Sequence, residues 1–207
     1  IGFGGDGSFS WEDLSARYQS ELANGFGNLA SRVIAMVSKY FDGVVPAASE
    51  YLDVDLHIQR VTKDAAETAD AAIDRFAIHE AVAAVWTIVD ELNGYITTQE
   101  PWALAKDEAN IARLGTVLYT TSEGLRALAV LLSPVIPAAT QKLWSALGAE
   151  HELGHLRDQV IVDAGHWGQL PAGSRMHTID PLFPRIETPE LGESRTGSAT
   201  PAPTAPA

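Results

Sequence analysis

The sequence predicts an all-α protein, a bundle of about five to six helices with a loop-rich C-terminal segment wrapped around it. Apolar residues recur every three or four positions through most of the first 147 residues, the spacing of one helix face. No clear run of alternating apolar and polar residues, the mark of a strand, occurs. Glycine and proline become frequent from Gly148, and the residues after Glu187 are rich in Pro, Ala and Thr, a composition typical of disorder. We therefore expect a junction over residues 1–9, one helical domain over 10–187 and a disordered tail over 188–207.

The first helix is expected to begin at Ser10, because Asp13 follows three residues later in the manner of a capping box. Its apolar face starts at Leu14 and continues at helical spacing to Tyr40. Gly25 and Gly27 interrupt this stretch. Interior glycines weaken a helix and often mark close approach of another backbone.

Two further helices are expected over residues 51–74 and 76–97, the first strongly acidic and the second richer in inward apolar residues. Pro101 suits the first turn of the next helix, since the N–H that proline lacks would be unpaired there. That helix is expected to continue to Leu132. Two prolines then end it, and a last helix runs up to Gly148, a natural C-terminal stop.

The composition limits the possible functions. With 14 basic and 27 acidic side chains the net charge is −13, so a protein that grips nucleic-acid backbone broadly is disfavoured. The absence of cysteine excludes disulfides and thiol catalysis and fits a cytoplasmic protein. The longest mainly apolar run, Ala127–Ala139, is too short to span a membrane and contains two prolines. The first residue is Ile1, so we expect a fragment or a processed product.

Two short motifs match chemistry that their surroundings do not support. The stretch Gly2–Gly7 fits the dinucleotide pattern G-x-G-x-x-G but has no room for a preceding strand, so we interpret it as a glycine turn. The stretch His151–His155 fits the zinc-peptidase pattern H-E-x-x-H, with Glu152 as the general base. Gly154 lies inside this motif and weakens its helix, so we expect surface histidines and no metal. A zinc hydrolase would need a third ligand from His166, His177 or Glu187.

Four separated segments carry a resemblance, and they agree in order and spacing: Leu22–Arg32, Asn93–Lys106, Leu132–Pro137 and Leu182–Ile186. Together they closely resemble the anticodon-binding domain of bacterial methionyl-tRNA synthetases over about residues 5–187. Residues 6–10 look like the junction between the catalytic and anticodon-binding regions of that family. The resemblance implies a helical bundle that reads the CAU anticodon of methionine tRNA.

The resemblance also implies the site residues. In the family, an Asn and an Arg one helical turn apart, and a Trp after a Pro at a later helix start, contact the unstacked anticodon bases. They correspond here to Asn28, Arg32 and Trp102. Elementary chemistry agrees, since positions i and i+4 share a helix face and sequence-specific RNA readers stack unpaired bases on aromatic side chains. Basic side chains that we expect to contact phosphate are Lys39, Lys106 and Arg113.

The resemblance extends to the parent enzyme. The family's catalytic signatures, HIGH and KMSKS, are absent from this chain, so we expect it to have no catalytic residue and no cofactor, and to be inactive alone. The full-length enzyme would use ATP and methionine in an upstream catalytic domain, act as a monomer and bind no membrane. Three alternatives stay open: the anticodon-binding domain of a class I synthetase for valine, leucine or isoleucine, a zinc hydrolase, and a purely structural helical module.

Overall fold

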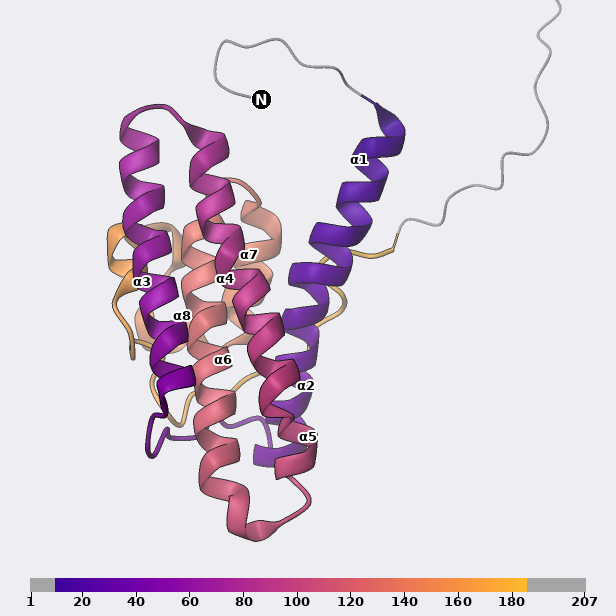
Figure 1. The fold of residues 1–207 in the computed structure, drawn as a ribbon, viewed down its shortest axis with the longest axis vertical. Coiled ribbons are helices and arrows are strands. Elements are labelled where there is room, and N and C mark those ends of the chain that lie inside the picture. Colours follow the sequence, from indigo (N-terminus) through magenta and orange to yellow (C-terminus); the bar gives the residue numbers. More distant parts are fainter. Residues whose placement is uncertain (1–9, 186–207) are drawn as a thin grey trace, which may run out of the picture.

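The structure, a computed structural model, describes residues 10–185, and within that range it confirms the all-α bundle (Figure 1). The expected junction over 1–9, with its glycine motif, and the expected tail over 188–207 lie outside the described residues. The helical elements in chain order are α1 (Trp11–Arg17), η1 (Tyr18–Gly27), α2 (Asn28–Phe41), α3 (Asp53–Asp74), α4 (Ile78–Gln99), α5 (Pro101–Leu104), η2 (Glu108–Asn110), α6 (Ile111–Leu132), α7 (Pro137–Ala146), α8 (Ala149–Leu153), η3 (Leu156–Asp158) and η4 (Val162–Gly165).

The first helix starts where the sequence predicts it, because the Ser10 side chain accepts a hydrogen bond from the Asp13 N–H at 3.2 Å. Its middle part, η1, is wound as a π-helix and includes both expected interruptions, Gly25 and Gly27. A Cβ on Gly27 would lie 3.1 Å from the Phe183 ring and 3.0 Å from the Leu22 carbonyl oxygen. The glycine therefore allows the C-terminal segment to approach this helix closely.

The helix α6 forms the centre of the bundle. Every residue from Leu114 to Leu132 is buried. The long pair α3 and α4 packs along it, and α2 and α7 also contact it (Figure 1). One continuous apolar core results, with Trp144 and Phe26 among its largest fully buried side chains.

One expected helix is in fact two. The sequence predicts an uninterrupted helix from Pro101 to Leu132, but α5 ends at Leu104 and α6 begins at Ile111. Asp107 causes the break, because its backbone is extended and its side chain accepts the Ala109 N–H at 3.0 Å. The side chain thus caps a new helical turn, as aspartate commonly does.

The expected C-terminal wrap is fastened to α6 by a buried carboxylate. Glu123 is fully buried and accepts the backbone N–H groups of residues 168–170 at 2.8–3.1 Å. Arg126, also buried, donates to Glu123 at 2.9 Å and to the Ala164 carbonyl at 2.8 Å. A polar residue in an apolar helix thereby holds a segment about 45 residues further along the chain.

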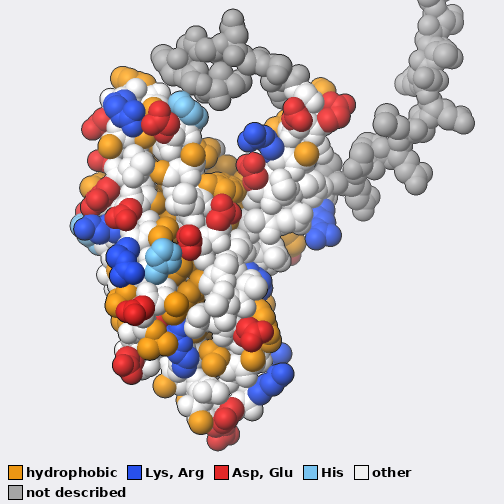
Figure 2. All heavy atoms as spheres, in the orientation of Figure 1, with side chains coloured by type: hydrophobic (Ala, Val, Ile, Leu, Met, Phe, Trp, Pro, Cys, Tyr) orange, Lys and Arg blue, Asp and Glu red, His pale blue; other side chains and the backbone are white. Residues whose placement is uncertain are grey.

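The N-terminal helix α1 projects from the bundle, and none of its residues is buried (Figure 1). A mostly apolar groove of 770 Å³ lies between α1–η1 on one side and α4 on the other, with Leu14, Tyr18 and Trp86 in its walls. Figure 2 shows apolar atoms exposed along this groove. Among residues 10–185, no helix is long and apolar enough to cross a membrane.

Candidate functional site

Asn28 and Arg32 lie on one face of α2, as their spacing predicts. Asn28 is exposed and has helical backbone angles of −67° and −37°, so it continues the helix from η1 into α2. Arg32, one turn later, is half-buried. An exposed amide and a guanidinium therefore lie side by side, and both groups can donate hydrogen bonds to a base edge.

The guanidinium of Arg32 is held by a residue of another helix. Arg32 Nη2 donates to Asn93 Oδ1 at 3.0 Å, and Asn93 Nδ2 donates to the Val89 carbonyl at 2.9 Å. Burial lowers the pKa of Arg32. Among the described residues, its Nε atom is buried without a hydrogen-bond partner. Asn93 therefore fixes the direction in which Arg32 points.

Trp102 lies in the first turn of α5, directly after the buried Pro101. Its side chain is 40% exposed, whereas the core residue Trp144 is fully buried. A tryptophan that served only as a core anchor would be covered. The exposed indole therefore offers an aromatic surface on α5, the short helix near the lower end of the bundle (Figure 1).

A hollow with a mainly apolar lining and a few polar groups adjoins Asn28. It has a volume of 310 Å³ and is lined by Asn24, Asn28 and Arg185, among others. Arg185 Nη2 donates to Asn24 Oδ1 at 3.4 Å, and the Phe183 ring packs against Phe26 with ring centroids 6.1 Å apart. The C-terminal segment thus places a cation beside Asn28. The Leu182–Ile186 motif marked this segment in the sequence, but no signal assigned Arg185 to the site.

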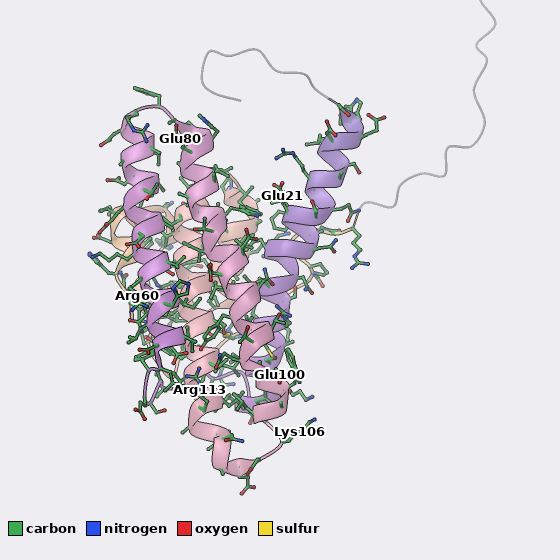
Figure 3. The ribbon with its side chains drawn as sticks, in the orientation of Figure 1. Glu21, Arg60, Glu80, Glu100, Lys106 and Arg113 are labelled. Carbon is green, nitrogen blue, oxygen red and sulfur yellow. The ribbon has the colours of Figure 1, made fainter. Side chains whose placement is uncertain are left out.

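The three basic residues expected to contact phosphate are placed differently. Lys39 and Lys106 are exposed, and Lys39 Nζ lies 5.2 Å from the centre of the Tyr40 ring. Arg113 instead donates to Asp55 and Gln99, and its side chain is only 19% exposed. Figure 3 shows Lys106 at the outer edge of the lower end and Arg113 among the helices. These bonds hold the Arg113 guanidinium in the interior, so Arg113 is not placed to contact phosphate.

The histidine motif does not gather ligands. The helix α8 ends at Leu153, so His151 and His155 do not share a helical turn. His151 pairs with Glu152 at 2.8 Å, and His155 pairs with Glu150 at 2.9 Å. Among residues 10–185, no group of three His, Cys, Asp or Glu side chains is placed to hold a metal ion.

Comparison with known proteins shows which family the chain resembles in sequence. Residues 55–173 match the family model described as the anticodon-binding domain of tRNA ligase. The chain is 53% identical over 190 residues to the methionine–tRNA ligase of Streptomyces coelicolor, covering 90% of this chain and 35% of that protein. It is 37% identical to the methionine–tRNA ligase of Caldanaerobacter subterraneus, covering 90% and 28%.

The fold is similar to solved structures as well. The crystal structure of free Mycobacterium tuberculosis methionyl-tRNA synthetase superimposes with a TM-score of 0.82 at 35% identity, covering 91% of this chain and 37% of that one. A structure of the same enzyme with methionyl-adenylate gives a TM-score of 0.81. The chain thus spans about a third of the length of the relatives that it matches.

Proposed function

Since the chain belongs to the family of anticodon-binding domains of tRNA ligases, we propose that it reads the CAU anticodon of methionine tRNA for a methionine–tRNA ligase. The relatives that bear this name support the choice of amino acid. Asn28 and Arg32 supply hydrogen-bonding groups, Trp102 supplies a stacking surface, and Lys39 and Lys106 contact phosphate. Anticodon loops are single-stranded, so their bases can be splayed out onto such a surface.

The observation that carries the proposal is the hydrogen bond between Arg32 and Asn93. It holds a planar set of N–H donors in one direction at the surface, and a pre-oriented donor loses less freedom when it binds a base. Asn93 lies six residues before the end of α4, about 9 Å along the helix axis, and Trp102 comes three residues after that end. The hydrogen bond thus links α2, which carries Asn28 and Arg32, to α4, and α4 is followed directly by α5, which carries Trp102.

The parent enzyme that we propose joins methionine to its tRNA with ATP, and both small molecules bind in a catalytic domain outside this chain. We expect it to be a cytoplasmic monomer. The chain itself contributes recognition and, by this proposal, neither a catalytic residue nor a cofactor site. Its segments 1–40 and 101–147 carry net charges of only −1 and +1, so the residues proposed to meet RNA lie outside the most acidic stretches.

Replacing Trp102 tests the stacking surface. Trp102→Ala is expected to weaken binding of a CAU anticodon stem-loop by about 1–3 kcal/mol, the range found for loss of one base–aromatic stack. The measurement is a fluorescence or calorimetric titration of the 207-residue chain. Trp11→Ala removes an exposed indole from α1 and serves as the matched control, which should leave binding unchanged. Equal affinity of the Trp102→Ala variant and the unaltered chain would remove Trp102 from the site.

A further inference from the structure

We infer that four side chains beneath the turn between α4 and α5 position Trp102 for RNA. The residues are Asp55, Tyr95, Gln99 and Arg113, and we call them the clamp. The inference rests on the proposed function, because it explains how the stacking side chain is kept in place. These residues come from three helices, α3, α4 and α6, and meet at the lower end of the bundle, where Figure 3 labels Arg113 and Glu100.

The centre of the clamp is a buried carboxylate. Asp55 is fully buried. Arg113 donates to both of its oxygens, from Nη1 to Oδ2 at 2.5 Å and from Nη2 to Oδ1 at 2.9 Å. The Tyr95 hydroxyl also donates to Oδ1, and the Leu52 N–H donates to Oδ2 at 2.7 Å. A buried charge with this many donors has one favourable arrangement, since losing any donor leaves part of the charge unpaired.

Gln99 links this carboxylate to the end of α4. Arg113 Nη2 donates to Gln99 Oε1 at 2.6 Å. The Asp55 carboxylate accepts four hydrogen bonds, and none of them comes from Gln99. The bond between Arg113 and Gln99 is therefore not one of the bonds that pair the buried charge. Its effect is on α4, because Gln99 is the last residue of that helix and lies one turn after Tyr95. Tyr95 and Gln99, at the two ends of the final turn of α4, are thereby both bonded to the ion pair of Asp55 and Arg113.

The chain between Gln99 and Trp102 leaves little freedom. Glu100 has the left-handed backbone angles 45° and 58°, a conformation that residues other than glycine rarely adopt. Pro101 follows, with its φ angle fixed by the ring, and it is buried. The Glu100 carbonyl accepts the Ala103 N–H at 2.7 Å. With the last turn of α4 clamped, the direction of α5 is set, and with it the backbone position from which the Trp102 side chain projects.

The inference is tested with Gln99 variants, because Gln99 lies outside the proposed RNA contacts. Gln99→Ala is expected to weaken CAU stem-loop binding about three- to tenfold, the loss that corresponds to one hydrogen bond. Gln99→Glu keeps an acceptor for Arg113 and should retain binding within about twofold. Thr98→Ala is the matched control, since Thr98 is exposed and its hydroxyl donates to the Gly94 carbonyl of its own helix. Circular dichroism checks that every variant is folded.

A double-mutant cycle separates positioning from a general structural role. If Gln99 acts through Trp102, Gln99→Ala has no further effect on binding in the Trp102→Ala background. An equal loss in both backgrounds would overturn the inference. Unchanged binding by Gln99→Ala, while Trp102→Ala weakens it, would overturn the inference alone. Equal binding of all anticodons by the unaltered chain would overturn the proposed function and the inference with it.

Discussion

Asp55 is completely buried, yet its pKa is below the usual value for an aspartate. Burial alone opposes ionisation, but the hydrogen bonds from Arg113, Tyr95 and the Leu52 N–H outweigh it. The same interaction raises the pKa of Arg113 against the opposing effect of burial. Burial also raises the pKa of Tyr95, and its bond to the carboxylate adds to that shift. At neutral pH the pair is therefore charged, and its charge contributes to folding.

The lowered pKa gives a pH dependence with a definite sign. A carboxyl group whose pKa is lower in the folded state stabilises the fold above its unfolded pKa of about 3.9 and loses that contribution as the pH falls through the folded value. Asp55→Asn is expected to lower the free energy of unfolding by about 2–3 kcal/mol at pH 7. The difference from the unaltered chain should shrink below pH about 4. Urea unfolding at pH 7 and pH 3 measures it.

The exposed Asp53 at the start of the same helix provides the control. Asp53→Asn should change the free energy of unfolding by less than about 0.5 kcal/mol, as surface substitutions commonly do. A difference between Asp55→Asn and the unaltered chain that stays constant from pH 7 to pH 3 would show that the carboxylate charge is not what stabilises the fold.

Part of the candidate site could be predicted from single residues, and part could not. Spacing alone puts Asn28 and Arg32 on one helix face, because i and i+4 are neighbours in any α-helix. The partner of Arg32 is 61 residues away in the sequence, and no local pattern marks that distance. For the same reason the sequence cannot tell that Arg113 pairs with Asp55, 58 residues earlier. A surface arginine and a buried one look alike until tertiary contacts are known.

At the scale of elements, α4 carries Asn93, the partner of Arg32, and next to it an exposed glycine. Gly94 follows Asn93 directly, and a Cβ added to it would meet no atom within 4 Å apart from its chain neighbours and the nearby backbone of its own helix. Gly124 in α6 is the opposite case, since its added Cβ would lie 2.7 Å from Leu92 Cδ1, and Leu92 is fully buried. Both glycines lie inside helices, so they differ in packing and not in local conformation.

These two glycines predict opposite effects of one substitution. Gly94→Ala should raise the free energy of unfolding by about 0.5–1 kcal/mol, because alanine loses less conformational freedom in a helix. Gly124→Ala should lower it by about 1–3 kcal/mol, because the extra methyl overpacks a core that cannot move aside. Urea unfolding of both variants measures the pair. Stabilisation by Gly124→Ala would mean that α4 and α6 pack less closely than described.

The helices themselves were largely predictable. The expected ranges 51–74 and 76–97 lie within two residues of α3 and α4 at each end, because small or apolar residues recur at helical spacing in both. The division between α5 and α6 was missed, since the capping by Asp107 competes with a helical pattern that continues across it. The π-helical winding of η1 was also missed. Its two glycines indicated that the helix is disturbed there, but they did not indicate that the disturbance is π-helical winding.

At the scale of the whole molecule, charge and site are separated along the chain. Residues 41–75 and 76–100 carry net charges of −5 and −4, while the segments with Asn28, Arg32 and Trp102 are nearly neutral. Figure 2 shows acidic and basic side chains intermingled over the face that contains α3. Such a surface does not attract a phosphate backbone broadly. Recognition of a few unstacked bases therefore has to supply the affinity and the selectivity.

A comparison of anticodons tests whether the chain reads the bases of CAU. The 207-residue chain is titrated at one fixed salt concentration with a CAU stem-loop and with stem-loops that differ only in the anticodon, including those of valine and isoleucine tRNAs. We expect CAU to bind at least about tenfold more tightly, the effect of one or two hydrogen bonds to a base edge. Equal affinities for all stem-loops would contradict that expectation.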